Sequence, residues 1–323
     1  MRAWWLDAST DPPRMLLREV DRPVPGAGQV LLRMRAVGLN RGEFIIGGLS
    51  KAGTAKPLGI EGAGEVLAAG PGATRYAAGD RVMGRFPGGL AEYAVANESD
   101  LLHVPDSLGW DAAGALLVTF MVAHDMVLLQ GGLKAGGWLL VAGVTSGVGV
   151  ASLQIAHAIG ARVIGTSRSA DKLEKLQALG LDVALCTRTA DLYPAVMQAT
   201  GGAGVSLVVN AVGGSVFADC VRCLAYEGRL ATVGYVDGQL QAPLDLQALH
   251  AKRLVLFGVS NKMTTPQQKA LAVRQFEHDM LPLVASGRVR PVIERMFGFD
   301  DALAARVLME SNAHTGKIVV TIP

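Results

Sequence analysis

The stretch from Trp138 to Arg168, WLLVAGVTSGVGVASLQIAHAIGARVIGTSR, most constrains what this chain can fold into. Trp138 to Ala142 form an uninterrupted apolar run, which is typical of a strand buried on both faces of a parallel sheet. Gly143 ends this run, apolar residues at helical spacing follow, and Gly160 ends the helical pattern. The order predicts a strand, a glycine turn, an amphipathic helix and a second strand, Arg162 to Thr166.

This order of elements is the one that binds the pyrophosphate of a dinucleotide at a helix N-terminus. Gly147 and Gly149 have no side chain, so backbone N–H groups at the helix start can approach the phosphates. Ser146 stands where the middle glycine of a G-x-G-x-x-G pattern would be, so the glycines alone are a weak signal. The flanking strand and helix favour a cofactor site, formed by Ser146, Gly147, Val148 and Gly149, over a glycine turn without a ligand.

The end of the second predicted strand indicates which nicotinamide cofactor is bound. NAD sites place a carboxylate about 20 residues beyond the glycines, whereas NADP sites place small polar and basic groups there. This chain continues as TSRS at 166–169, with Lys172 a turn later and no acid before Asp171. We therefore expect NADPH, held at its 2′-phosphate by Ser167, Arg168 and Lys172; an ordinary solvated loop is the alternative. Asp171 is expected to cap the following helix.

Composition narrows the classes of partner. The chain has 323 residues, 50% of them apolar, and a net charge of +2. This length supports two domains with separate cores, and the near-neutral charge argues against a nucleic-acid partner. The longest apolar stretch, Ala112 to Ala123, is too short to span a bilayer, and MRAWWLDAST at the N-terminus lacks the features of an export signal. We expect a cytoplasmic protein that binds a small-molecule substrate and no membrane.

Three cysteines, Cys186, Cys220 and Cys223, are too few for a disulfide framework. Cys220 and Cys223 form a C-x-x-C, but they lie inside a predicted helix, Ser215 to Tyr226, and not at its N-terminus, where a redox pair gains thiolate character. Because no second cysteine pair or nearby histidine completes a zinc set, we interpret both as small buried core residues.

The pattern of apolar runs divides the chain into a β-rich part and an alternating part. Before residue 115, short strands are predicted at Gln29–Val37, Gly62–Ala69, Asp80–Gly84 and Ala91–Val95. From Leu116 onward, helices alternate with six strands, the number of a doubly wound sheet, at Trp138–Ala142, Arg162–Thr166, Val183–Cys186, Ser206–Asn210, Arg229–Val233 and Arg253–Val259. A helix, Pro266–Ser286, and a strand, Lys317–Ile322, are predicted in the last part.

Six short motifs carry a family resemblance: AVGLNRGEF at 36–44, GIEGAGEV at 59–66, GDRVMG at 79–84, GGLAEYAVA at 88–96, GLKAGGWLLVAGVTSGVG at 132–149 and GKIVV at 316–320. In order and spacing they resemble the medium-chain dehydrogenase/reductase superfamily, specifically its zinc-independent quinone oxidoreductase and enone reductase branch, over essentially the whole chain. The resemblance implies an α/β protein: a GroES-like β-barrel catalytic domain plus a Rossmann domain with a doubly wound parallel sheet, and a cleft between them. We assign residues 1–117 to the former, 118–262 to the NADP-binding domain, and 263–323 to a segment returning to the catalytic domain.

The same comparison of motifs argues against zinc. Where zinc-dependent relatives carry a cysteine this chain has Asn40, and where they read Gly-His-Glu it has Gly59, Ile60 and Glu61. Ile60 cannot coordinate a metal, and no cysteine lies between Glu92 and Pro105, where the structural zinc lobe would be. Without a Lewis acid, hydride addition is expected at a quinone or an α,β-unsaturated carbonyl, whose anionic product is delocalised.

The resemblance also implies which residues border the cofactor and the substrate. Asn40 is expected to line the nicotinamide and substrate pocket and to bond a ribose hydroxyl or a substrate carbonyl; a turn residue is the alternative. Tyr235 is a possible proton donor, or else an aromatic wall. Arg41 and Glu43 can reach the same cleft or stay solvated, and the buried Glu61 is expected to pair with an arginine. The remaining cofactor contacts are expected at Thr119, Asn210, Val212, Gly213, Gly234, Val259 and Ser260.

The role of His124, the oligomeric state and two rival functions remain to be considered. His124 is interpreted as an interdomain hydrogen-bonding residue, not a catalytic one. The segment 256–260 ends an edge strand, which in relatives pairs across a dimer, so a homodimer is expected. A non-catalytic NADPH-binding sensor or structural protein on the same scaffold, and an enoyl thioester reductase, are the rival functions.

Overall fold

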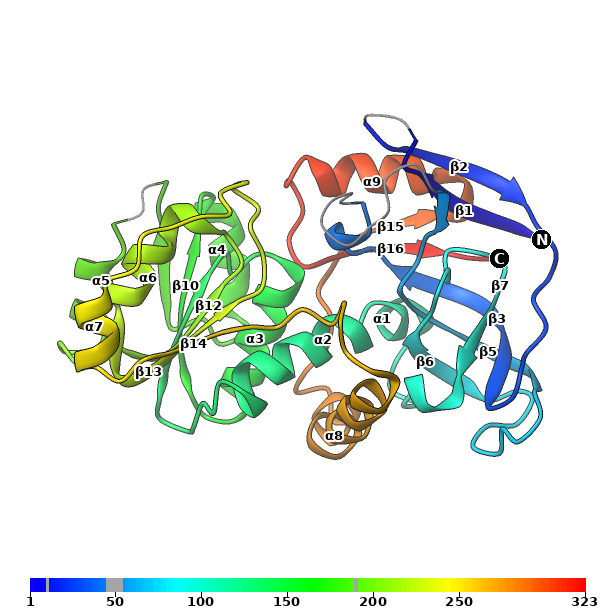
Figure 1. Ribbon diagram of the computed structural model, residues 1–323, viewed down its shortest axis with the longest axis horizontal. Helices are drawn as coiled ribbons and strands as arrows, with labels where there is room; N and C mark the ends of the chain where they lie inside the picture. Colours follow the sequence, from blue (N-terminus) through cyan, green and yellow to red (C-terminus); the bar gives the residue numbers. More distant parts are fainter. Residues whose placement is uncertain (10–11, 45–54, 189–190) are drawn as a thin grey trace. The chain divides into compact units, whose positions relative to one another are not determined.

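The computed structural model describes residues 1–9, 12–44, 55–188 and 191–323. These residues form two compact units (Figure 1). The first unit comprises Met1–Val118, Pro266–Gly287 and Pro291–Pro323, and the second comprises Thr119–Thr265 and Arg288–Arg290. The helix α2 (Leu117–His124) carries the chain from the first unit into the second and continues as a π-helical turn, Asp125–Leu129.

The second unit is built on a parallel sheet of six strands in the order β11-β10-β9-β12-β13-β14. The strand order reverses beside β9, so this is the doubly wound Rossmann sheet that the sequence predicts. The strands are β9 (Trp138–Ala142), β10 (Arg162–Ser167), β11 (Val183–Cys186), β12 (Val205–Asn210), β13 (Leu224–Thr232) and β14 (Val255–Gly258).

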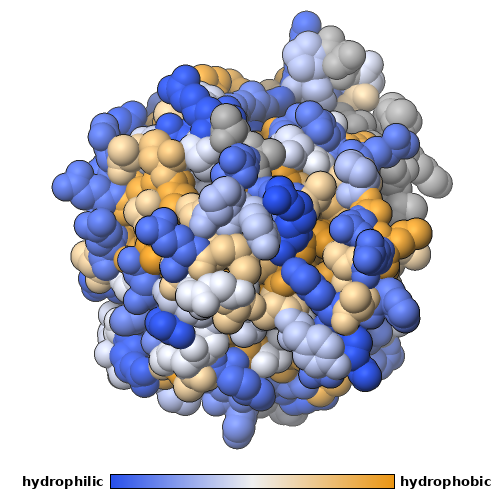
Figure 2. All heavy atoms as spheres, turned by 90° about the vertical axis from the view of Figure 1, so that its left-hand side faces the viewer, coloured by the Kyte–Doolittle hydropathy of each residue, from blue (hydrophilic) through white to orange (hydrophobic). Residues whose placement is uncertain are grey.

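Helices cover this sheet and bury its apolar strands. They are α3 (Gly147–Ala158), α4 (Ala170–Gln177), α5 (Tyr193–Ala199), α6 (Phe217–Arg222) and α7 (Leu246–Ala251). Leu140, Ile164 and Val208 are fully buried in the resulting core, and each contributes about 1.5–3 kcal/mol by leaving water. Hydrophilic side chains cover most of the face that bears α5 and α7, with apolar ones in small groups between them (Figure 2).

The predicted helix from Ser215 to Tyr226 is wrong at both ends. A 3₁₀ turn, Gly214–Val216, precedes the short helix α6, and the strand β13 begins at Leu224. Leu224 is buried and pairs with Val205 in the parallel register of β12 and β13. Pairing in a buried sheet satisfies the backbone of this segment, so it overrides the helical pattern of the sequence.

The first unit contains two antiparallel-rich sheets, as expected of a GroES-like barrel. One has seven strands in the order β15-β16-β3-β5-β6-β8, with β7 paired to β3, and the other has the order β2-β1-β4. The C-terminal strand β16 pairs antiparallel with β3, which adds the last residues of the chain to this unit. The strands are β1 (Arg2–Asp7), β2 (Arg14–Glu19), β3 (Gln29–Gly38), β4 (Ala55–Pro57), β5 (Glu61–Ala69), β6 (Arg81–Arg85), β7 (Tyr93–Asn97), β8 (Leu101–His103), β15 (Ile293–Gly298) and β16 (Lys317–Thr321).

Three helices and three 3₁₀ turns complete the described part of the first unit. The helices are α1 (Trp110–Gly114), α8 (Pro266–Ala285) and α9 (Ala302–Glu310), and the turns are Arg41–Glu43, Glu98–Asp100 and Phe299–Asp301. Two buried ring groups of this core have bonded polar atoms: the Trp4 indole N–H donates to the Phe299 carbonyl, and the Tyr76 hydroxyl donates to the Leu101 carbonyl. None of the helices that the structure describes is long and apolar enough to cross a membrane.

Candidate cofactor and active site

The glycine turn after β9 is held in place by the Ser146 hydroxyl. Ser146 is the N-cap of α3: its Oγ accepts from the Gly149 amide at 3.1 Å and donates to the Gly143 carbonyl at 2.8 Å. The serine that replaces the middle glycine therefore caps the helix and holds the turn in place. Among the described residues, no oxygen accepts from the amides of Gly147 and Val148, so these two N–H groups can donate to an anion.

Gly149 is required by the close packing of the helix against the turn. A Cβ at this position would lie 2.5 Å from the Gly143 carbonyl oxygen and 2.7 Å from that of Val144. The turn is also tied to β10, because the amides of Gly143 and Val144 donate to the side chain and the backbone oxygen of Thr166. The predicted pyrophosphate site thus lies at the N-terminus of a twelve-residue helix, beside a turn that these contacts hold in place.

The end of β10 is polar and contains no acidic residue, as the sequence indicates. The residue that caps the following helix, α4, is not the one that we expected. Ser169 is the N-cap of α4, and its hydroxyl accepts from the Lys172 amide. Asp171, which we expected to cap this helix, lies instead inside its first turn, where its negative charge favours the helix N-terminus without capping it. Arg168 is exposed beside this cap.

Arg188 is a residue of this region that the sequence analysis missed. In the parallel register of β10 and β11, Ser167 pairs with Cys186, and the Thr187 amide donates to the Ser167 carbonyl at 3.0 Å. The segment that carries Arg188 therefore leaves the sheet at the same edge as Arg168, and both arginines are exposed. The pairing of the two strand ends was the available signal, since carboxyl ends of adjacent parallel strands meet.

The loop after β12 is shaped by the buried Asn210 side chain. Its Oδ1 accepts from the amides of Val212 and Gly213 at 2.9 and 3.0 Å, and its Nδ2 donates to the Gly213 carbonyl at 2.9 Å. Gly213 has a φ of 129°, a conformation that favours glycine. The Asn210 amide thus holds the backbone of the predicted cofactor loop in place through these three hydrogen bonds.

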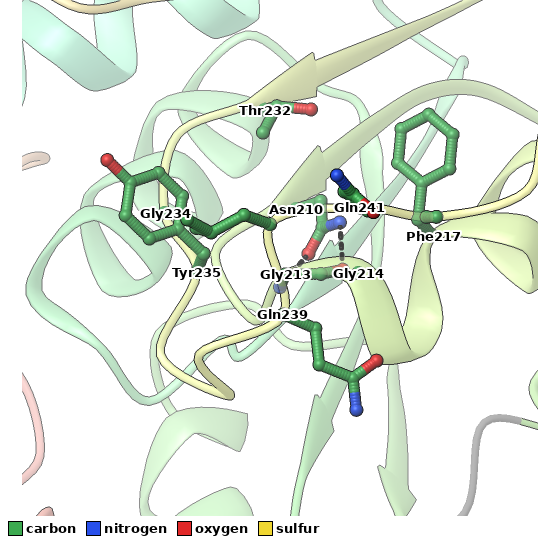
Figure 3. Close-up of a pocket in the computed structure, with 11 residues that line it drawn as sticks. Asn210, Gly213, Gly214, Phe217, Thr232, Gly234, Tyr235, Gln239 and Gln241 are labelled. Atoms are coloured by element: carbon green, nitrogen blue, oxygen red, sulfur yellow. Dashed lines mark hydrogen bonds between the residues drawn. The ribbon is translucent and has the colours of Figure 1, made fainter. Parts of the chain in front are cut away.

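A cavity of about 440 Å³ opens at the carboxyl ends of β12 and β13 (Figure 3). It brings together four residues predicted to border the cofactor, Asn210, Gly213, Gly234 and Tyr235, whereas Val212 is outside its lining. Tyr235 is half exposed at the rim. Among the described residues that line the cavity, none is charged; the others are Gly214, Phe217, Thr232, Gln239, Leu240, Gln241 and Ala242. Sequence reasoning did not find these others: Thr232 was read only as part of its strand, and the rest follow β12 or β13 by several residues.

Other predicted cofactor residues of the second unit lie outside this cavity. Thr119 and His124 are buried in α2, and the cavity lining includes neither. Val259 is buried and Ser260 exposed directly after β14. The structure therefore concentrates the predicted contacts at two places, the glycine turn with the ends of β10 and β11, and the cavity beside β12 and β13.

In the first unit, Asn40 joins a buried ion pair. Lys317 donates through Nζ to the Glu61 carboxylate at 2.8 Å, to Asn40 Oδ1 at 2.9 Å and to the Leu39 carbonyl at 3.0 Å. Glu61 is 0% exposed and Lys317 is 4% exposed. The partner of Glu61 is therefore a lysine from the GKIVV motif, not the arginine that we expected.

The donors around Glu61 do not fit zinc. The neighbouring Ile60 side chain has no donor atom, Asn40 offers a neutral amide, and the Glu61 carboxylate is already bonded to an ammonium group. The ammonium of Lys317 supplies a positive charge beside the carboxylate.

The Asn40 amide is committed within the first unit. Its Nδ2 donates to the Gly38 carbonyl at 3.2 Å and to Glu61 at 3.0 Å, and the residue caps the turn Arg41–Glu43. The amide oxygen is engaged as well, because Oδ1 accepts from Lys317 and takes part in the capping box with the Glu43 amide, so a new bond to a substrate oxyanion or to a ribose hydroxyl would compete with an existing one. Both roles expected of Asn40, the contact with a ribose hydroxyl and the contact with a substrate carbonyl, stay predictions.

Glu43 is a buried structural carboxylate, and Arg41 is anchored. Glu43 accepts from the amides of Gly59 at 2.7 Å, Ile60 at 3.2 Å and Asn40 at 3.1 Å. Burial raises the pKa of Glu43 to about 7, because the cost of desolvation outweighs these hydrogen bonds and the nearby lysine charge. Arg41 donates to the Met309 carbonyl and to Asn312 at 2.6 Å each, so neither charge is a solvated loop group.

The raised pKa of Glu43 predicts a pH-dependent stability. A folded-state pKa of about 7, above the usual 4.5, gives stability that is present below pH 4.5 and is lost as the pH rises through 7. Between about pH 5 and about pH 8 this group is expected to lower the free energy of unfolding by roughly 2–3 kcal/mol. Urea unfolding of wild type and Glu43→Gln across this range measures it. Parallel pH profiles for the two proteins would contradict the assignment.

The C-x-x-C pair is confirmed as core. Cys220 and Cys223 are fully buried at α6, and burial raises the pKa of both thiols, that of Cys223 to about 12. Neither forms a thiolate at neutral pH, which a redox pair needs.

Two family models match the chain. The model described as alcohol dehydrogenase GroES-like domain matches residues 26–106. The model described as zinc-binding dehydrogenase matches residues 147–276. The first falls in the first unit and most of the second falls in the second unit.

Two curated relatives show what kinds of protein the chain resembles. It is 30% identical over 268 residues to the quinone oxidoreductase-like protein 2 homolog of Nematostella vectensis, covering 81% of this chain and 72% of that protein. It is 32% identical over 312 residues to a phenolphthiocerol/phthiocerol polyketide synthase of Mycobacterium tuberculosis. That match covers 95% of this chain but spans only 14% of the synthase.

A solved structure agrees with these matches over the full length. A mycobacterial protein complexed with NADPH superposes with a TM-score of 0.89 at 27% identity, covering 99% of each chain. The GroES-like unit, the Rossmann sheet, the glycine turn and the N. vectensis relative all indicate the same family. The chain belongs to the medium-chain dehydrogenase/reductase superfamily of NAD(P)-dependent oxidoreductases, in its zinc-independent quinone oxidoreductase branch.

Proposed function

We propose that the chain is an NADPH-dependent, metal-free oxidoreductase that reduces a quinone or an α,β-unsaturated carbonyl compound. The observation that carries this proposal is the pair of exposed arginines, Arg168 and Arg188, at adjacent strand ends with no acid between Thr166 and Asp171. A carboxylate there would repel a 2′-phosphate, whereas guanidinium groups bind it through charged hydrogen bonds. The solved relative that holds NADPH supports the same cofactor.

Other parts of the cofactor are proposed to bind at the glycine turn and in the cavity beside β12 and β13. The free amides of Gly147 and Val148 are proposed to bind the pyrophosphate, and the uncharged cavity beside Asn210 to hold the nicotinamide ring. When bound, NADPH supplies a hydride. Tyr235 walls the cavity, and its hydroxyl is the group that can donate the proton completing the reduction.

The ion pair between Lys317 and Glu61 supports the proposed kind of acceptor. Reducing a simple ketone concentrates charge on one oxygen and gains from a Lewis acid, whereas an enone or a quinone spreads that charge over several atoms. Hydrogen bonds stabilise a delocalised anion sufficiently. The buried pair of Lys317 and Glu61 therefore favours conjugated acceptors.

An enoyl thioester reductase is the second candidate. The observation that favours it is the match to the mycobacterial polyketide synthase over 95% of this chain. The chemistry at the alkene is the same, so the two candidates differ only in what is attached to the carbonyl.

NADPH consumption with a panel of quinones, enones and enoyl thioesters tests this proposal. We expect turnover with quinones or enones that persists after prolonged treatment with a strong chelator, because Ile60 and Asn40 cannot form a zinc site with Glu61. The apo protein should bind no stoichiometric zinc. Turnover of thioesters alone would favour the second candidate, and turnover of nothing in the panel would favour a non-catalytic NADPH-binding protein.

We also propose a homodimer formed through β14. Among the described strands, β14 is the last in the sheet order and pairs only with β13, and Val255 on it is 40% exposed. An unpaired apolar edge strand is a liability that pairing with a second copy removes.

A further inference from the structure

Asp237 ties together the two loops that line the cavity of the second unit. Its Oδ2 accepts from the Ser215 amide at 2.8 Å and from the Ser215 hydroxyl at 2.5 Å, and its Oδ1 accepts from the Gln239 amide at 2.9 Å. Ser215 follows the β12 loop, and Gln239 follows the β13 loop. One carboxylate therefore spans both walls of the cavity without being part of its lining.

Backbone hydrogen bonds between the same two loops, and the packing of Asp237 against Gly213, add to the link that the Asp237 carboxylate makes. The Asp237 amide donates to the Val212 carbonyl at 3.0 Å, and the Gly214 amide donates to the Gln239 carbonyl at 3.0 Å. A Cβ on Gly213 would lie 2.0 Å from Asp237 Oδ1, so the carboxylate sits directly against the glycine backbone. Figure 3 shows Gly213, Gly214 and Gln239 adjacent on the same side of the cavity.

The carboxylate is suited to remain ionised in this role. Burial alone would raise the pKa of Asp237, but the hydrogen bonds from Ser215 and Gln239 outweigh it and lower the pKa below its usual value. An ionised acceptor makes each of these bonds charge-assisted and so stronger than a neutral one.

We propose that Asp237 is a positioning residue that sets the width of the cavity between the β12 and β13 loops, and so its fit to a neutral planar ring such as nicotinamide. The uncharged lining suits a neutral ring, and the hydroxyl of Thr232 and the amide of Gln241 suit its carboxamide. This inference rests on the proposed function for the identity of the ring. Asp237 itself touches neither the ring nor the reacting atoms.

Binding measurements on the apo protein separate the ring from the rest of the cofactor. Dissociation constants are measured by calorimetry for NADPH and for 2′,5′-ADP, which carries the 2′-phosphate but no nicotinamide. For Asp237→Ala we expect the NADPH constant to rise roughly 10-fold, because several hydrogen bonds that hold the walls are lost, while the 2′,5′-ADP constant stays within about 2-fold. Hydrogen exchange of the amides in 212–217 and 237–241 should speed up.

Two further variants guard against a simple folding defect. Asp237→Asn keeps the shape and one acceptor oxygen, so its loss of NADPH affinity should be intermediate. Asp245→Ala is the matched control: Asp245 caps α7 by accepting from the Ala248 amide at 2.9 Å and lies outside the cavity lining. It should leave both dissociation constants unchanged.

The outcomes distinguish the inference from the proposed function. Unchanged NADPH affinity in Asp237→Ala, or an equal loss for both ligands, would overturn the inference. A selective loss of NADPH affinity in a protein whose wild type reduces no acceptor would support the inference and overturn the proposed function.

Discussion

Replacing both Arg168 and Arg188 with alanine is expected to weaken NADPH binding by roughly 30- to 1,000-fold, or about 2–4 kcal/mol, and to change NADH binding by less than about 3-fold. The two side chains are exposed at the ends of adjacent paired strands, where a 2′-phosphate would meet both guanidinium groups. NADH has no 2′-phosphate, so the loss should be confined to NADPH. Fluorescence titration of each variant with both cofactors measures the difference.

A matched control comes from the other end of the same strand. Arg162 is also exposed, and it stacks on Trp138 at the start of β10, away from the carboxyl ends that bind cofactors. Arg162→Ala should leave both affinities unchanged. If the double variant loses affinity for NADH and NADPH equally, these arginines act on the shared part of the cofactor and the assignment to the 2′-phosphate is wrong.

Replacing Lys317 with methionine is expected to lower the free energy of unfolding by about 3–5 kcal/mol, because it leaves the Glu61 carboxylate buried without its cation. Glu61 is fully buried, and the Asn40 amide alone does not neutralise it. Urea unfolding at neutral pH measures the loss. This is the largest stability effect that we expect from a single substitution in the described part of the chain.

The double variant Lys317→Met/Glu61→Leu tests the cause of that loss. Replacing both partners of a buried pair with apolar residues is often nearly neutral, so the double variant should recover at least about 2 kcal/mol. Arg253→Met, which removes the cation of an exposed pair with Glu227, should cost less than about 1 kcal/mol. A double variant as unstable as Lys317→Met would mean that the lysine acts through packing and not through its charge.

Local sequence pattern was sufficient for the Rossmann sheet. The predicted bounds of β9 and β11 are the observed ones, and the other four strands were found with shifted ends. Parallel strands are buried on both faces, so their sequences are apolar runs that are bounded by glycine or by polar turns. The same reasoning placed Gly147 and Gly149 at the start of α3. It failed from Ser215 to Tyr226, where pairing with β12 decided the structure.

The candidate site was predictable only where its residues are close in sequence. The glycine turn and the polar end of β10 each lie within one short segment, so their residue types were visible before the fold was known. The partner of Glu61 is 256 residues away, and Arg188 reaches Arg168 only through strand pairing.

The sequence by itself determined the class of fold, the glycine turn and the acid-free end of β10, because apolar periodicity and backbone freedom are local properties of a chain. The tertiary structure alone decided that an ammonium group neutralises Glu61, that Asn40 is committed to that pair, and that Asp237 joins two loops. The physical reason is that a buried charge or a loop carboxylate takes whichever partner the packed fold brings within hydrogen-bonding distance, and sequence separation does not limit that choice.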